Sequence, residues 1–282
     1  MILDWRTLQN FVIIKSIMSK QIKITFENEP EGLVTEDQIK RLFLHPKSTI
    51  VGPKQGLVSI VKDPLDSIKK VLQIKYPAGI IQEQKTRWKP RFEPVETATL
   101  SYKVMFPEGF DFVRGGKLPG LGGGSAPSGG ASTAEADGFS TRIMWREHGV
   151  LCQYVYYMDR PGTQKWGTNF LFTTDSDKNK PITKDMWEDM SKRFPDRMYL
   201  IPGKWHTLKT QIKMNTPGQE DGKLITWFDG KESVNINLRF RKDLSFAIDM
   251  LYFTTFFGGN MPDWAPKKEE VVYFDGIEIE LG

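Results

Sequence analysis

The segment from Gly138 to Arg160 carries the side chains best suited to chemistry. Its first half alternates two kinds of residue, with Phe139, Ile143 and Trp145 in one set and Ser140, Arg142 and Arg146 in the other. Because side chains alternate across a strand, this pattern predicts a β-strand with one apolar and one polar, cationic face. Tyr154 and Tyr156 share one face of the strand that follows. Together these groups can neutralise an anion and move a proton.

The connection between the two strands decides whether these groups meet. A two-residue turn at 148–149 pairs Arg142 with Val155, which puts the tyrosines on the opposite face. A three-residue loop at 148–150, with its glycine in a left-handed conformation, pairs Arg142 with Tyr156. We predict the three-residue loop, because it gathers the serine, the arginine and both tyrosines on one surface.

Such a surface fits β-elimination in a polymer of uronic acids. The C5 proton of a uronate is barely acidic until a cation or hydrogen-bond donors neutralise the adjacent carboxylate. A base then takes this proton while an acid protonates the departing O4. Arginine and lysine can neutralise the carboxylate, and a tyrosine or lysine whose pKa is lowered by positive charge can serve as base or acid. The alternative is that arginine and tyrosine merely form cross-strand pairs. We expect no metal and no organic cofactor.

The elements that would position these residues are mostly strands. From Val95 onward, short segments alternate apolar and polar residues, most clearly at Leu208–Met214. Similar strands are predicted at 98–106, 223–230 and 273–281, with turn residues between them. Many strands and little helix predict an all-β fold, a β-jelly roll of two curved antiparallel sheets with a few short helices.

Two helices and one loop interrupt the strands. Helices are expected at Glu36–Leu44 and Thr183–Phe194, the second capped by its threonine. The glycine- and serine-rich stretch 120–138 is predicted to be a flexible loop inside the domain, either a lid over a cleft or a tolerated insertion. We expect a loosely ordered extension at 1–19 and a single domain at 20–282.

Composition narrows the choice of partners. The chain has 282 residues, and 39 Lys and Arg against 35 Asp and Glu give a net charge of +4, which suits a polyanion. No Lys/Arg-rich tract points to nucleic acid, and no run of ~20 apolar residues could span a membrane. Cys152 stands alone, so no intrachain disulfide can form. The first residues lack the apolar centre and cleavage site of a signal peptide.

Other catalytic motifs have weaker support. Lys117 follows glycines, but the spacing of a nucleotide-binding loop is missing. The acidic stretch from Asp175 resembles a calcium loop, yet Lys180 replaces its glycine, and the three histidines are too scattered for a zinc site. Glycoside hydrolysis by a pair of carboxylates stays open, with Glu147 and Asp159 as the candidates.

Several separate strings resemble polysaccharide lyase family 14. GFDFVRGGKLPGL at 109–121 is followed by FSTRIMWR and YVYYMD, in the order and nearly at the spacing of that family's signature. Further likeness runs through 205–230 and through FFGGN and YFDGIEIE near the end, so it covers the chain from about Leu72 onward. Members of this family are β-jelly rolls that act on alginate or on glucuronate-containing polymers, including those of Chlorella-type cell walls.

The resemblance also implies functional residues. It implies Lys117 in the GGKLPGL string, Ser140 and Arg142 in the next strand, and Tyr154 and Tyr156 after it. Lys117 and Arg142 would bind or neutralise the carboxylate, Lys117 with a possible share in proton transfer, and one tyrosine would be the acid or base. Which tyrosine performs which step stays open.

The remaining expectations concern the substrate and its setting. We expect further substrate contacts from Arg91, Arg114, Arg146 and Asn169. The partner would be an acidic polysaccharide, with no nucleic acid, no membrane and a monomeric protein, although the sequence does not choose between mannuronate, guluronate and glucuronate. The protein would act on extracellular or cell-wall polysaccharide, released by lysis or carried in a virion. The competing function is a carbohydrate-binding jelly roll without catalysis.

Overall fold

The computed structural model describes residues 20–81, 85–133, 136–160, 166–175, 179–183, 194–259 and 261–282. The extension expected at 1–19 and nearly all of the helix expected at Thr183–Phe194 lie outside these residues. Within the described part of the chain, no helix has the length and apolar character needed to cross a membrane.

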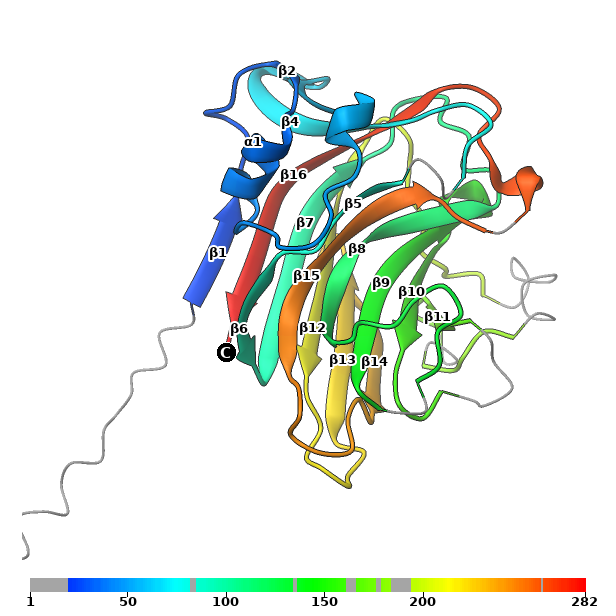
Figure 1. The fold of residues 1–282 in the computed structure, drawn as a ribbon. Helices are drawn as coiled ribbons and strands as arrows, with labels where there is room; N and C mark the ends of the chain where they lie inside the picture. Colours follow the sequence, from blue (N-terminus) through cyan, green and yellow to red (C-terminus); the bar gives the residue numbers. More distant parts are fainter. Residues whose placement is uncertain are drawn as a thin grey trace, which may run out of the picture.

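The described strands form two antiparallel sheets stacked as layers (Figure 1). The larger sheet runs in the order β14 (Lys231–Leu238), β13 (Gly222–Phe228), β12 (Trp205–Lys213), β7 (Thr97–Met105), β16 (Glu270–Leu281), β4 (Asp66–Tyr76), β3 (Val58–Asp63) and β2 (Gly32–Leu33), with β1 (Lys20–Ile24) beside β16. The second sheet, here called the site sheet, runs in the order β11 (Thr168–Leu171), β10 (Leu151–Tyr156), β9 (Gly138–Arg146), β8 (Gly115–Gly124), β15 (Ile248–Phe257) and β5 (Thr86–Trp88), with β6 (Arg91–Val95) also paired to β15.

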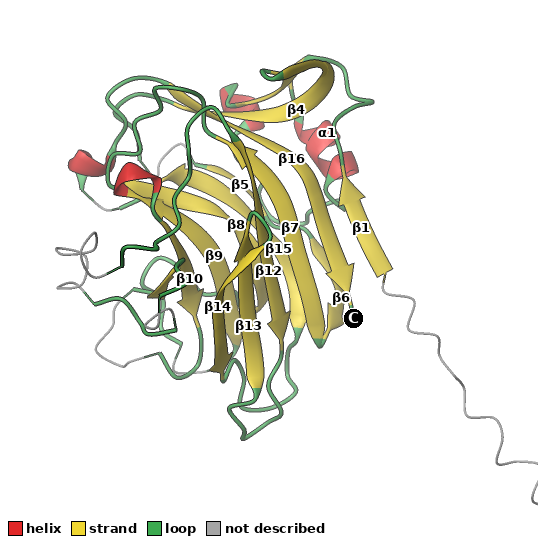
Figure 2. Ribbon diagram, turned by 180° about the vertical axis from the view of Figure 1, so that it is seen from behind, coloured by secondary structure: helices red, strands yellow, loops and turns green. Residues whose placement is uncertain are grey.

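The core fills the space between the two sheets, which both curve in the same sense (Figure 2). Alternation in β12 buries Leu208 and Ile212 and leaves Lys209 and Lys213 more exposed, as the sequence predicts. Aromatic rings join the layers: Phe253 of β15 lies 5.4 Å from Phe274 of β16, centroid to centroid. Such edge-to-face contacts add to the stabilisation from burying the rings.

Helical segments are short and lie outside the sheets. Helix α1 (Glu36–Leu42) begins at Thr35, whose hydroxyl accepts a hydrogen bond from the Gln38 backbone amide in a capping box. It ends two residues earlier than predicted, because Leu44 and His45 adopt left-handed φ angles of 55° and 49°. The other helical segments described are the 3-10 turns η2 (Pro53–Gln55), η3 (Glu147–Gly149) and η4 (Pro262–Trp264).

The β9–β10 connection has the predicted length but a different position. Its three residues are Glu147–Gly149, since the Arg146 amide donates to the Val150 carbonyl, so the predicted loop at 148–150 is wrong. Arg142 therefore pairs with Tyr154 instead of Tyr156. The pairing differs by two residues, which preserves the face, so the predicted common surface forms.

The prediction that the stretch 120–138 is a loop throughout is wrong, because β8 continues to Gly124. Glycine is required there by the neighbouring strands: a Cβ on Gly120 would lie 1.7 Å from the Thr141 carbonyl oxygen, and one on Gly123 would lie 2.1 Å from that of Ala247. These glycines therefore allow close packing of the sheet rather than flexibility.

Candidate functional site

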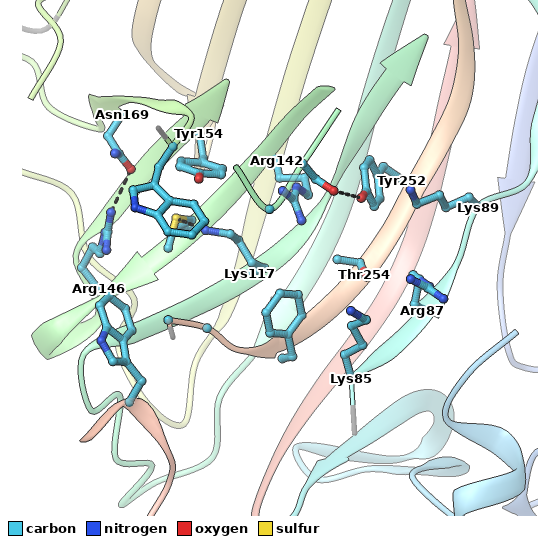
Figure 3. Close-up of a pocket in the computed structure, with 18 residues that line it drawn as sticks. Lys85, Arg87, Lys89, Lys117, Arg142, Arg146, Tyr154, Asn169, Tyr252 and Thr254 are labelled. Carbon is cyan, nitrogen blue, oxygen red and sulfur yellow. Dashed lines mark hydrogen bonds between the residues drawn. The ribbon is translucent and has the colours of Figure 1, made fainter. Parts of the chain in front are cut away.

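A pocket of about 320 Å³ opens on the face of the site sheet that is turned away from the core. Its walls come from β5, β8, β9, β10, β11 and β15, from residues 128–129 and 166, and from the segment after β15 (Figure 3). Among the described residues that line it, six are lysine or arginine and none is aspartate or glutamate; the six are Lys85, Arg87, Lys89, Lys117, Arg142 and Arg146. The pocket is therefore built for an anion.

Lys117 lies on β8, in the middle of the site sheet, between Met144 of β9 and Phe256 of β15. Its side chain is 8% exposed, and Nζ lies 3.7 Å from the centroid of the Tyr154 ring and contacts the Met144 sulfur. Burial, followed by the positive charges of Arg142 and Arg146, holds the pKa of Lys117 well below its usual value. A neutral amine in this position can accept a proton.

Arg142 points from β9 into the centre of the pocket. The residue is 4% exposed, and its guanidinium lies between two rings, 5.7 Å from the centroid of Tyr154 and 4.7 Å from that of Tyr252. Its Nε is buried without a hydrogen-bond partner among the described residues. A buried, incompletely paired guanidinium costs stability unless a ligand completes it, and a carboxylate matches its geometry.

Tyr154 and Tyr156 form a pair of phenols on β10. Their hydroxyl oxygens lie 3.3 Å apart, and the Gly167 amide donates to Tyr154 Oη at 2.9 Å. Burial and the neighbouring Tyr156 raise the pKa of Tyr154, so this phenol keeps its proton. Only Tyr154 of the two lines the pocket.

Ser140 and Tyr156 lie behind the pocket wall. Ser140 Oγ donates to the Pro127 carbonyl at 2.6 Å, and Tyr156 Oη accepts from the Gly130 amide at 2.9 Å. Both residues are almost fully buried. They thus hold the loop that brings Ser128 into the lining, so their contacts favour a role in positioning.

Tyr252 of β15 is a site residue that the sequence did not reveal. It is 3% exposed, the Lys89 Nζ lies 3.9 Å from its ring centroid, and its hydroxyl donates to Ser128 Oγ at 3.0 Å. Burial alone would raise the pKa of Tyr252, but the charges of Arg142 and Lys89 and the hydrogen-bond contacts with Lys89 and Ser128 outweigh it and bring the pKa to about 8. Tyr154 and Tyr252, on either side of Arg142, are therefore shifted in opposite directions.

The four expected substrate-binding residues separate into two pairs. Arg146 and Asn169 line the pocket, where the guanidinium donates to Asn169 Oδ1 at 2.9 Å. Arg114 is ion-paired with Asp263 at 2.8 Å and Arg91 with Asp249, and neither arginine lines the pocket.

The two carboxylates considered for hydrolysis also lie outside the pocket. Glu147 lines a separate hollow beside Phe110, and Asp159 pairs with Arg239, 2.6 Å from carboxylate oxygen to guanidinium nitrogen. A hydrolase needs two carboxyl groups facing the scissile bond, and the described lining of the pocket offers none. Glu147 and Asp159 therefore do not form the predicted catalytic pair in this pocket.

Solved structures share this fold. Alginate lyase from Aplysia kurodai aligns with a TM-score of 0.68 at 23% identity, covering 94% of this chain and 100% of that one. Alginate lyase vAL-1 from Chlorella virus aligns with a TM-score of 0.60 at 25% identity over 80% of this chain and 89% of that one. A mutant of alginate lyase Aly36B, solved with an alginate trisaccharide, gives a TM-score of 0.75 at 17% identity over 94% and 99% of the two chains. The predicted β-jelly roll is thereby confirmed.

Sequence comparison agrees with these structures. Exolysin of Paramecium bursaria Chlorella virus 1 is 24% identical over 193 residues, which are 65% of this chain and 29% of the viral protein, so the chain spans less than one third of that relative. The family model described as Polysaccharide lyase 14 matches residues 64–277. The match includes the strands that carry Lys117, Arg142 and Tyr154, and the chain belongs to polysaccharide lyase family 14.

Proposed function

We propose that the protein is a polysaccharide lyase that cleaves a polymer of uronates by β-elimination. The observation that carries this proposal is the buried Arg142, which lies beside an amine of lowered pKa and a phenol of raised pKa in a pocket without a described carboxylate. Groups whose pKa values are pushed apart in one site are the expected acid and base of a proton-transfer reaction.

The elimination then assigns one task to each group. Arg142 binds the uronate carboxylate and withdraws charge from C5. The neutral Lys117 amine accepts the C5 proton, the electron pair of that bond forms the C4–C5 double bond, and the C4–O4 bond breaks. Tyr154 donates its proton to the departing O4 and is supported by its hydrogen bonds to Tyr156 and Gly167. Two roles were expected for Lys117, neutralising the carboxylate and transferring a proton. The lowered pKa of Lys117 favours the second, because a neutral amine can accept a proton.

The test is the ultraviolet absorbance of the conjugated double bond that elimination creates. Polymannuronate, polyguluronate and glucuronan are offered in parallel to the wild type, with Lys117→Ala as the inactive control. We expect absorbance on at least one polymer and none with the variant. New reducing ends without absorbance would refute elimination.

A binding module without catalysis is the second candidate, because the same cationic pocket would hold a uronate chain. In that case all three polymers stay intact while at least one binds, and Lys117→Ala changes affinity alone. The pKa shifts of Lys117 and Tyr154 favour the enzyme, because binding alone requires neither.

We further propose that the substrate is an extracellular or cell-wall polysaccharide, reached by release on lysis or from a virion. Support comes from two viral relatives, Exolysin and an alginate lyase from Chlorella virus. We propose that the protein is a monomer and that it binds neither nucleic acid nor membranes. We also propose that its activity requires no metal and no organic cofactor. Size-exclusion chromatography tests the oligomeric state, and activity after treatment with a chelator tests the metal.

A further inference from the structure

Strand β5 places a row of three cations along one wall of the pocket. The strand pairs with β15 through Thr86, Arg87 and Trp88. Its inward side chains are buried, and Trp88 stacks on Phe253 with the ring centroids 4.4 Å apart. Because side chains alternate, Arg87 of β5 and the flanking Lys85 and Lys89 lie on the opposite face; these three, here called the β5 strip, all line the pocket.

The β5 strip lacks counter-charges within the described part of the chain. Its side chains are half-buried, and no ion pair joins any of them to a described carboxylate. The pKa of Lys85 is lowered, first by burial and then by the charges of Arg87, Arg142 and Lys89. Like charges held this close repel one another, so the arrangement is stabilised when an anion lies among them.

The strip extends the site in one direction from Arg142. Figure 3 shows Lys117, Tyr154 and Arg146 on one side of Arg142, and Tyr252 and the strip on the other. Tyr252 joins the two parts, since its ring contacts both Arg142, at 4.7 Å, and Lys89, at 3.9 Å. Alternate residues of a strand are about 6.7 Å apart, so the strip presents charges at successive positions along a bound chain.

We propose that the β5 strip is a second carboxylate-binding site, which holds uronates adjacent to the one at Arg142 and makes the enzyme select chains of consecutive uronates. This proposal rests on the proposed function, because it assumes that the uronate to be cleaved lies at Arg142. A polymer in which neutral sugars alternate with uronates supplies fewer carboxylates to the strip and is expected to be a poorer substrate.

The test compares two triple variants with the same change in net charge. The strip variant carries Lys85→Gln, Arg87→Gln and Lys89→Gln. The control variant carries substitutions of three exposed lysines on β1, β3 and β14, namely Lys20→Gln, Lys62→Gln and Lys231→Gln. Values of kcat/KM are measured on uronate oligomers of increasing length, and circular dichroism confirms that both variants fold.

We expect the strip variant to lose roughly tenfold to hundredfold in kcat/KM on long chains. On the shortest cleavable oligomer its loss should stay within about threefold, and the control should match the wild type throughout. An equal loss at every length, or no loss at all, would overturn the proposal.

A binding measurement separates this proposal from the proposed function. The Kd for the polymer is determined in a Lys117→Ala background with and without the strip substitutions. Weaker binding with the strip removed supports the second site even if the wild type cleaves nothing, an outcome that would refute only the lyase. Equal affinity for a sulfated polysaccharide without uronates would refute the selection of carboxylates.

Discussion

Replacing Tyr252 by phenylalanine tests how the site handles charge as the pH rises. Loss of the Tyr252 proton puts a phenolate beside Arg142 and Lys89, where it competes with the substrate carboxylate for the same cations. With a pKa of about 8, and if the phenolate form binds no substrate, kcat/KM falls by a factor of 1 + 10^(pH − 8). This factor is about 2 at pH 8 and about 11 at pH 9, whereas an ordinary tyrosine, with its pKa near 10, gives about 1.1 at pH 9.

The assay is kcat/KM from pH 6 to pH 9.5 by product absorbance. We expect Tyr252→Phe to remove the fall of kcat/KM at alkaline pH, because no phenolate can form. The fall of kcat/KM at acid pH, which reflects protonation of Lys117, should stay in place. Tyr273→Phe, on β16 of the larger sheet, serves as the matched control and should behave as the wild type. An unchanged fall in Tyr252→Phe would refute the reasoning. A rise through pH 8 that Tyr252→Phe abolishes would make Tyr252, rather than Lys117, the proton acceptor.

Three further predictions concern catalysis and packing. Lys117→Arg replaces the proton-accepting amine with a permanently charged guanidinium, so kcat should fall by about 10²-fold or more at every pH; activity near the wild type would show that positive charge at this position is sufficient. Tyr154→Phe removes the proton for O4 and should lower kcat by about 10²- to 10⁴-fold with an unchanged melting curve, and a loss confined to KM would contradict this role. Gly120→Ala places a Cβ 1.7 Å from the Thr141 carbonyl oxygen and should lower Tm by roughly 6 °C or more in a thermal melt; an unchanged Tm would mean that β8 and β9 can separate without cost.

The catalytic strands could be predicted because their signals are local. Alternation assigned Arg142 to one face of β9, and two tyrosines two residues apart had to share a face of β10. The exact pairing depended on where the turn begins, and the turn begins at Glu147, one residue earlier than predicted, with His148 and Gly149 both in left-handed conformations. A shift of one residue in the loop changes the pairing by two, so the face survived the error.

Tyr252 and the β5 strip were missed because their neighbours are distant in sequence. Strand β15 pairs with both β8 and β5, and nothing local in the sequence specifies that pairing. A signal did exist, since cations at 85, 87 and 89 alternate with Thr86 and Trp88. Arg91 continues the same alternation in sequence. The chain leaves β5 before Pro90, however, so Arg91 lies on β6, where it forms an ion pair with Asp249 and does not line the pocket.

The close packing of β8 against its neighbours also bears on how the protein can diverge. Glycines at 116, 120 and 123 leave no room for a Cβ, so the strand that carries Lys117 tolerates little sequence drift. The wall formed by β5 differs: β5 pairs with β15 through three residues and bridges to Val51, and its outward side chains can change without altering the core. Relatives could therefore acquire different polymer preferences by replacing side chains at the sheet's edge while inheriting the same reactive centre.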